Sequence, residues 1–136
     1  MSKPPSALDL SGNHNWRTDS NVAKGGYFDD LASHGLDLFV HLLGQMKAVS
    51  GFSSNQQGLY SAKDAITASW IHESGVTGTG NWNFGCKTHQ DKVVIFGSNG
   101  KIEFSIFDEK PLFLENKKGK IEILIEHPEN VQLFHV

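Results

Sequence analysis

The sequence predicts an α+β fold: a mostly antiparallel, open-faced sheet with one main helix packed on one face. The first observation is a single helical stretch over residues 25–44, whose apolar residues recur at helical spacing and which ends at Gly44. The second is the change to alternating, glycine-punctuated segments after residue 44, which is typical of strands. The third is the shortness of the connections, which leaves no room for parallel crossovers. One helix covers only one face of such a sheet, so the other face is expected to stay open.

The elements follow one another simply along the chain. Residues 1–23 are rich in Pro, Ser, Asn and Asp, and we expect them to be extended or irregular. After the helix, strands are expected at 47–52, 64–73 and 76–84, followed by hairpins over 91–107, with Asn99-Gly100 at the turn, and over 111–126. The glycines of residues 75–80 lack the lysine and helix of a phosphate loop, so they favour close-packed strands.

The uncovered sheet face is expected to meet a partner, most simply a second copy of the chain. An open face that carries Trp70, Trp82, Phe84 or Phe107 would be a large apolar patch, and such patches mark interfaces.

Composition excludes several classes of function. A length of 136 residues is typical of one domain, and a net charge of −3 argues against a nucleic-acid partner. No apolar run reaches membrane-spanning length, and the N-terminus lacks the apolar core of a signal peptide. The single Cys86 rules out an intramolecular disulfide and a cysteine-rich zinc site. These features favour a cytoplasmic protein with no membrane association.

Acidic and histidine residues form a stripe along the helix. Asp30, His34, Asp37 and His41 are spaced i, i+4, i+7 and i+11, within roughly 60° of one another on one helix face. A carboxylate one turn before a histidine can fix the imidazole tautomer and leave the other nitrogen as a general base. Such pairs are also common as solvated surface pairs, so both interpretations stay open.

A metal site is a further reading of the same stripe. Two histidines and two aspartates could bind Zn²⁺ or Mn²⁺, but the stripe extends about 16 Å along the helix, so its four members do not converge on one ion. We therefore expect no metal ligands here. The histidines outside the stripe, including His72, are expected at the surface.

The order of motifs resembles the substrate domain of the Gfo/Idh/MocA oxidoreductases. Trp16-Arg17 precedes the pair Gly25-Gly26, and the pattern Asp30-x-x-x-His34-x-x-Asp37 follows. Lys24 stands where the family usually has the first glycine of a run. The later strands resemble the family's sheet, and residues 127–136 resemble the stretch that leads into its C-terminal helix. The resemblance extends from about residue 4 to the end of the chain.

This resemblance implies a glyceraldehyde-3-phosphate-dehydrogenase-like C-terminal fold. It implies that residues 1–136 are a single, partial substrate-binding and oligomerisation domain, with the N-terminal Rossmann domain absent. His34 would match the catalytic acid/base and Asp30 its acidic partner, while Trp16 and Arg17 would line the substrate side. The implied reaction oxidises a hydroxyl group of a sugar or polyol, with NAD or NADP bound by the missing domain.

The same resemblance implies that this chain binds no cofactor and turns over no substrate alone. It also implies a homo-oligomer through the open sheet face. The letters Glu109-Lys110-Pro111 spell a motif of the family, but they lie in the wrong domain, and Lys110 is given no role. Two alternatives remain: a non-catalytic carbohydrate- or protein-binding module, and a metal-dependent hydrolase that uses the acidic and histidine stripe.

Overall fold

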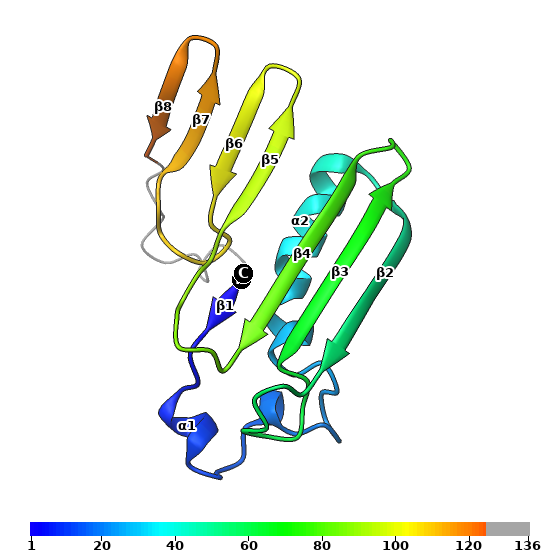
Figure 1. Ribbon diagram of the computed structural model, residues 1–136, viewed down its shortest axis with the longest axis vertical. Coiled ribbons are helices and arrows are strands. Elements are labelled where there is room, and N and C mark those ends of the chain that lie inside the picture. Colours follow the sequence, from blue (N-terminus) through cyan, green and yellow to red (C-terminus); the bar gives the residue numbers. More distant parts are fainter. Residues whose placement is uncertain (125–136) are drawn as a thin grey trace, which may run out of the picture. The chain divides into compact units, whose positions relative to one another are not determined.

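The computed structural model describes residues 1–124, and the chain forms two compact units that divide after Gln90 (Figure 1). The predicted α+β class with one main helix is confirmed. The strands, however, belong to two four-stranded sheets rather than to one. No helix in residues 1–124 combines the length and the apolar character of a membrane span.

The first unit contains the main helix and one of the sheets, whose strand order is β1-β4-β3-β2. Strand β1 pairs with β4 in parallel, and the other neighbours are antiparallel. The elements are β1 (Ser2–Lys3), α1 (Ala7–Leu10), a 3-10 turn η1 (Trp16–Thr18), a π-helical turn η2 (Phe28–Ala32), α2 (Ser33–Leu43), β2 (Met46–Ser54), β3 (Ala65–His72) and β4 (Thr77–Phe84).

The N-terminal segment is more ordered than the sequence suggested. Helix α1 begins with a capping box, in which the Ser6 hydroxyl accepts from the Asp9 N–H and the Asp9 carboxylate accepts from the Ser6 N–H. This reciprocal pair satisfies two donors of a four-residue helix in which Asp9 is the only buried residue. The expectation of an extended or irregular segment over residues 1–23 was therefore wrong for α1 and η1, while the short strand β1 agrees with it.

The main helix is not one regular α-helix. Its first turn is the π-turn η2, and regular α-helix begins only at Ser33. Gly44 ends α2 with a φ of 88°, as predicted. Before the helix, Gly26 has a φ of 59°, and an added Cβ would lie 2.8 Å from the Arg17 carbonyl oxygen. Glycine at position 26 therefore lets the chain pass close to the segment that carries Arg17.

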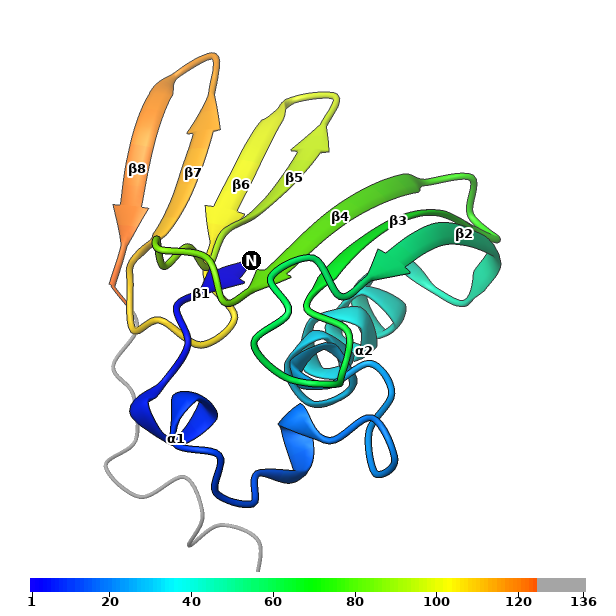
Figure 2. The same cartoon turned by 60° about the horizontal axis from the view of Figure 1, so that its bottom comes forward.

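Helix α2 lies across one face of strands β2–β4 (Figure 2). Phe39 of the helix stacks on Trp70, with ring centroids 5.9 Å apart, and Phe28 meets Trp82 edge-on at 5.0 Å. Tyr27, Ile66 and Phe84 form the buried cluster beside these pairs. The aromatic side chains Trp70, Trp82 and Phe84 therefore lie on the covered face, so these three side chains do not form an apolar patch on the open face.

The open face of this sheet is mainly polar. Register places Ser69 opposite Ser50 on one side and opposite Thr79 on the other, with Thr67 opposite Asn81. Ile71, opposite Ala48, and Phe52, opposite Thr67, are apolar residues on the same face, and Phe52 is 83% exposed. Hydroxyl and amide groups thus dominate the face that α2 leaves uncovered.

The second unit, described from Asp91 to Leu124, is an antiparallel sheet of the order β5-β6-β7-β8. Its strands are β5 (Val93–Gly97), β6 (Gly100–Phe104), β7 (Leu112–Asn116) and β8 (Gly119–Ile123). Both predicted hairpins are present, and ion pairs such as Lys92–Glu103 (2.8 Å) and Lys101–Glu115 (3.0 Å) lie on one of its faces. The predicted end of the last strand and residues 127–136 lie outside the described residues.

Candidate functional site

The Trp16-Arg17 pair lies in the 3-10 turn η1 of the first unit. Asn15 caps this turn, because its side-chain oxygen accepts a hydrogen bond from the Arg17 N–H at 3.2 Å. The Arg17 guanidinium lies 4.5 Å from the ring centroid of Trp16 and 6.0 Å from that of Tyr27. Trp16 is 38% exposed, so one large aromatic surface remains open to solvent beside the cation.

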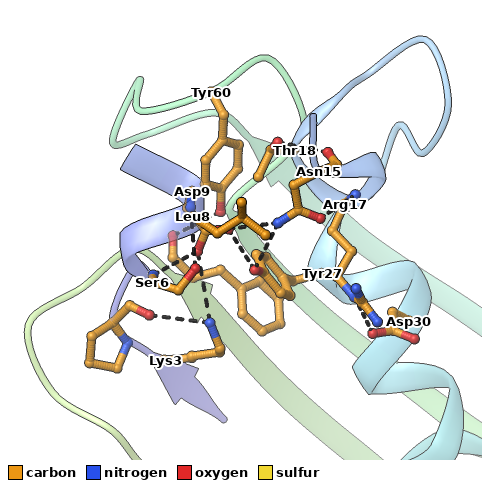
Figure 3. Close-up of polar contacts among 12 residues, drawn as sticks. Lys3, Ser6, Leu8, Asp9, Asn15, Arg17, Thr18, Tyr27, Asp30 and Tyr60 are labelled. Carbon is orange, nitrogen blue, oxygen red and sulfur yellow. Dashed lines mark hydrogen bonds and ion pairs between the residues drawn. The ribbon is translucent and has the colours of Figure 1, made fainter. Parts of the chain in front are cut away.

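Arg17 is joined to Asp30 of the π-turn. Its Nε donates to Asp30 Oδ2 at 2.5 Å, and the two side chains are 34% and 23% exposed (Figure 3). The two terminal nitrogens of this guanidinium have no hydrogen-bond partner within residues 1–124. The pair therefore leaves directed N–H donors beside the exposed ring of Trp16. Single π-turns of this kind occur frequently at functional sites.

His34 follows one turn after Asp30, in the first turn of α2, and it is exposed. Asp37 and His41 are exposed further along the helix, and His41 lies in its last turn, where a basic side chain favours the helix dipole. The structure thus brings three of the four predicted site residues together, namely Trp16, Arg17 and Asp30. The predicted orientation of His34 by Asp30 stays a prediction.

The acidic and histidine residues of the helix were also considered as metal ligands. Within the part of the chain that the structure describes, no three His, Cys, Asp or Glu side chains are grouped so that they could hold a metal ion. The geometry therefore offers no support for the metal-dependent hydrolase.

Sequence reasoning missed a buried polar cluster directly behind Arg17. We call it the Asp9 cluster; its members are Asp9, Asn15 and Tyr27 (Figure 3). Tyr27 Oη donates to Asp9 Oδ1 at 2.7 Å, and Asn15 Nδ2 donates to the same oxygen at 2.8 Å. The Lys3 ammonium lies 3.9 Å from Asp9 Oδ2 and 4.4 Å from the Tyr27 ring centroid.

The electrostatics of the Asp9 cluster favour one charge state. Burial alone would raise the pKa of Asp9, but hydrogen bonds from Tyr27 and Ser6, with the Lys3 charge, lower it below its ordinary value. Burial raises the pKa of Tyr27, and its hydrogen bond to Asp9 adds to this effect. The cluster is therefore a carboxylate held by a neutral phenol. The sequence shows one feature that could have indicated this cluster, the Ser6-x-x-Asp9 spacing of a capping box.

A loop of residues 55–63 lies against the segment that carries Arg17. Asp64, which is fully buried, accepts from the N–H groups of Gln56 and Gln57 at 2.6 and 2.8 Å and so fixes the start of the loop. The N–H groups of Ser61 and Ala62 donate to the Thr18 carbonyl. The backbone of the site is thus held from both sides.

His72 was expected at the surface, and this expectation was wrong. The side chain is buried at the end of β3, where Nδ1 donates to the Gly44 carbonyl at 2.6 Å and Nε2 accepts from Trp70 Nε1 at 3.2 Å. An indole N–H only donates, so the geometry requires a neutral imidazole with its proton on Nδ1. His72 therefore ties the end of the main helix to the sheet.

Comparison with known proteins places the chain in one family. The profile described as the GFO/IDH/MocA C-terminal domain matches residues 2–103. Oxidoreductase P35 of Formosa agariphila is 34% identical over 119 residues, which cover 87% of this chain and 36% of that protein. The chain therefore belongs to the GFO/IDH/MocA C-terminal domain family, and it spans only about a third of the length of this relative.

Solved structures share the fold at low sequence identity. Levoglucosan dehydrogenase in complex with NADH and levoglucosan has a TM-score of 0.74 and 18% identity, over 90% of this chain and 37% of the dehydrogenase. An oxidoreductase from Thermotoga maritima has a TM-score of 0.72 and 18% identity, over 92% of this chain and 36% of that one. The resemblance that the sequence predicted is confirmed at the level of fold and family.

Proposed function

We propose that this chain is the substrate-binding part of an NAD(P)-dependent oxidoreductase that acts on a hydroxyl group of a sugar, a polyol or a related compound. The observation that carries the proposal is the Trp16–Arg17–Asp30 arrangement at the start of the helix that bears His34. Membership of an oxidoreductase domain family supports it, as does the shared fold with a dehydrogenase solved with NADH and levoglucosan.

Each of these side chains suits a polyhydroxylated ligand. The exposed ring of Trp16 offers an apolar surface for the C–H face of a sugar. The terminal nitrogens of Arg17 offer hydrogen-bond donors to hydroxyl oxygens next to that ring. Because Asp30 neutralises the guanidinium, the pair as a whole favours an uncharged ligand over an anion.

In the proposed reaction, His34 is the general base. It would take the proton of the substrate hydroxyl as the carbon–oxygen bond becomes a carbonyl. The nicotinamide ring of the cofactor supplies the hydride acceptor. Residues 1–124 form no βαβ unit and the sequence carries no glycine fingerprint, so in this proposal residues outside the chain would hold NAD or NADP. In this proposal residues 1–136 are one partial domain of a cytoplasmic enzyme whose Rossmann domain is not part of the chain.

The proposal includes self-association through the open face of β2–β4. The support for it is that α2 leaves this face uncovered and that Phe52 on it is 83% exposed. Hydroxyl and amide side chains across the same strands offer hydrogen bonds to a second copy.

A fusion protein tests the chemistry. This chain replaces the matching segment of Oxidoreductase P35, and NAD(P)H formation is measured with a panel of sugars and polyols. We expect turnover, and we expect His34→Ala to lower kcat/KM about 10²–10⁴-fold, the usual cost of losing a general base. His41→Ala, the same substitution two turns along the helix, should leave the rate within about twofold.

Two results would count against the proposed function. Equal losses in the two histidine variants would remove His34 from the chemistry. Sugar binding without any NAD(P)H formation by a correctly folded fusion would favour the alternative, a non-catalytic carbohydrate-binding module.

A further inference from the structure

We propose that Asp9 is a positioning residue of the candidate site: through Asn15 and Tyr27, its buried carboxylate holds Arg17 against Asp30. The role of this arrangement in catalysis rests on the function proposed above, but the arrangement itself is tested without substrate or cofactor.

The carboxylate of Asp9 is built into the fold. Its side chain is only 1% exposed. Oδ2 accepts from the Ser6 N–H at 2.7 Å, and Oδ1 accepts from both Tyr27 Oη and Asn15 Nδ2. A buried carboxylate without hydrogen-bond donors is unfavourable, and hydrogen bonds to a charged group are strong. The charge of Asp9 therefore holds its donors, the Ser6 N–H, Tyr27 Oη and Asn15 Nδ2, in place.

Both donors lead from Asp9 toward the Arg17–Asp30 pair. The amide of Asn15 donates from Nδ2 to Asp9, and its oxygen accepts from the Arg17 N–H at 3.2 Å. Asn15 therefore ties the backbone of the 3-10 turn to the carboxylate. Tyr27 directly precedes the π-turn that carries Asp30, and its ring faces the guanidinium of Arg17 at 6.0 Å. One buried group thus anchors the elements that carry both partners of the ion pair.

Such an anchor matters because the ion pair is partly exposed. A solvent-exposed pair contributes little by itself, since water screens it and two long side chains lose freedom to form it. Here a single hydrogen bond from Nε joins the side chains. The Asp9 cluster fixes the backbone at residues 15–17, and two aromatic rings confine the guanidinium. Both effects reduce the conformational entropy that Arg17 loses when it forms the ion pair.

The chain offers a clean spectroscopic probe, because Arg17 is its only arginine. The Nε–H proton of Arg17 gives one side-chain signal in the proton–nitrogen spectrum of the isotope-labelled full chain. Its exchange with water is slowed while Asp30 accepts it. We expect Asp9→Asn to speed this exchange about two- to tenfold, the loss that corresponds to weakening one hydrogen bond.

Asp91→Asn is the matched control. It makes the same carboxylate-to-amide change at another buried aspartate with two backbone donors, Phe107 and Asp108, but in the second unit, outside the candidate site. We expect it to leave the Arg17 Nε–H exchange rate within about twofold of wild type even where it lowers overall stability. Asp30→Asn should remove most of the protection, which verifies that the signal reports the pair.

The proposal is overturned if Asp9→Asn leaves the Arg17 signal unchanged, or if Asp91→Asn speeds its exchange equally. Should Asp9→Asn fail to fold, Tyr27→Phe decides the matter. That variant removes one hydroxyl and keeps the ring against Arg17, so unchanged exchange there contradicts the proposal and faster exchange supports it. A failed fusion enzyme would instead contradict the proposed function and leave this result standing.

Discussion

At the scale of single residues, the two tyrosines of the chain share one environment. Burial raises the pKa of Tyr60, and the negative charges of Asp64 and Asp9 raise it further, while Tyr27 donates its proton to Asp9. Each phenol is thus favoured in its neutral form. The chain has no third tyrosine, so its phenolate absorbance reports these two groups alone.

We expect neither tyrosine of the folded chain to titrate at the ordinary value of 10.0. Below that pH both tyrosines are neutral in the folded and the unfolded chain. Above it the unfolded chain ionises first, so the free energy of unfolding decreases as the pH rises toward the folded pKa values. A spectrophotometric titration of phenolate absorbance measures this directly.

The same titration in urea is its control, because the unfolded tyrosines should ionise near 10.0. Overlapping curves for the folded and unfolded chain would contradict the buried placement of both phenols. A folded chain that ionises one phenol near 10.0 would contradict it for that residue alone.

Residues were predictable from the sequence only where they belong to a motif. Trp16, Arg17, Asp30 and His34 stand out because their order resembles a family pattern. Asn15 and Asp9 are residue types that occur in any turn, and Tyr27 in a helical segment reads as ordinary core. Their hydrogen bonds join positions 6 to 18 residues apart through irregular backbone, which periodicity does not describe.

At the scale of elements, the packing of α2 on the sheet depends on glycines in β4. A Cβ at Gly78 would lie 2.3 Å from the Trp70 ring, and one at Gly80 would lie 2.2 Å from the Trp82 ring. The two indoles therefore cover the backbone of the neighbouring glycines, where any side chain would displace them. The sequence predicted close packing at these glycines, and the structure shows that the partners are tryptophan rings.

We expect Gly78→Ala to lower the free energy of unfolding by about 1–3 kcal/mol, because the Trp70 ring must leave its place against Phe39. Equilibrium denaturation followed by tryptophan fluorescence measures the loss. Gly97→Ala in β5 is the control, since the nearest atom to its added Cβ is the Gly100 oxygen at 3.6 Å.

That control should change stability by no more than about 0.5 kcal/mol. A Gly78→Ala chain as stable as wild type would show that the Trp70 ring is not confined by the strand beneath it.

The π-turn shows where element prediction from sequence stops. The spacing of apolar residues predicted the helix and its end at Gly44 correctly. Periodicity assumes one rise and one angle per residue, so a single wider turn at residues 28–32 leaves no trace in the pattern. The angle of Asp30 to the rest of the stripe was derived for a regular α-helix, and this assumption was wrong at residues 28–32.

At the scale of the whole molecule, the pairing of neighbouring strands was predictable from turn residues, whereas the sheet face that each side chain occupies was not. Asn99-Gly100 predicted the hairpin of β5 and β6, although the two turn residues are Ser98 and Asn99 and Gly100 already pairs with Gly97. Strand β3 alternates Ile66 and Trp70 with Ile71, so apolar residues occur on both faces, and alternation alone does not say which face α2 covers. The division of the strands into two sheets was likewise invisible in hydrophobic pattern.

In the proposed function this chain binds the substrate and a separate domain binds the cofactor, and this leads to a final prediction. The chain contains three tryptophans, of which Trp16 is exposed while Trp70 and Trp82 lie under aromatic side chains of the main helix segment. In the isotope-labelled full chain, a sugar or polyol that binds at the candidate site should shift the Trp16 indole N–H signal saturably and leave the other two in place. NADH should produce no saturable shift of any of them, because the residues proposed to hold it lie outside the chain.

The variant Trp16→Ala tests whether the sugar binds at the candidate site. It removes the indole ring, but the hydrogen bonds of the Asp9 cluster and the Arg17–Asp30 hydrogen bond do not involve that ring. Saturable NADH binding by wild type would contradict the division of labour, because the cofactor would then have a site within this chain. Sugar binding that survives Trp16→Ala unchanged would place the ligand elsewhere, and the exposed indole would then have no part in recognition. The two ligands thus test the cofactor and substrate assignments separately, in one chain and with one set of signals.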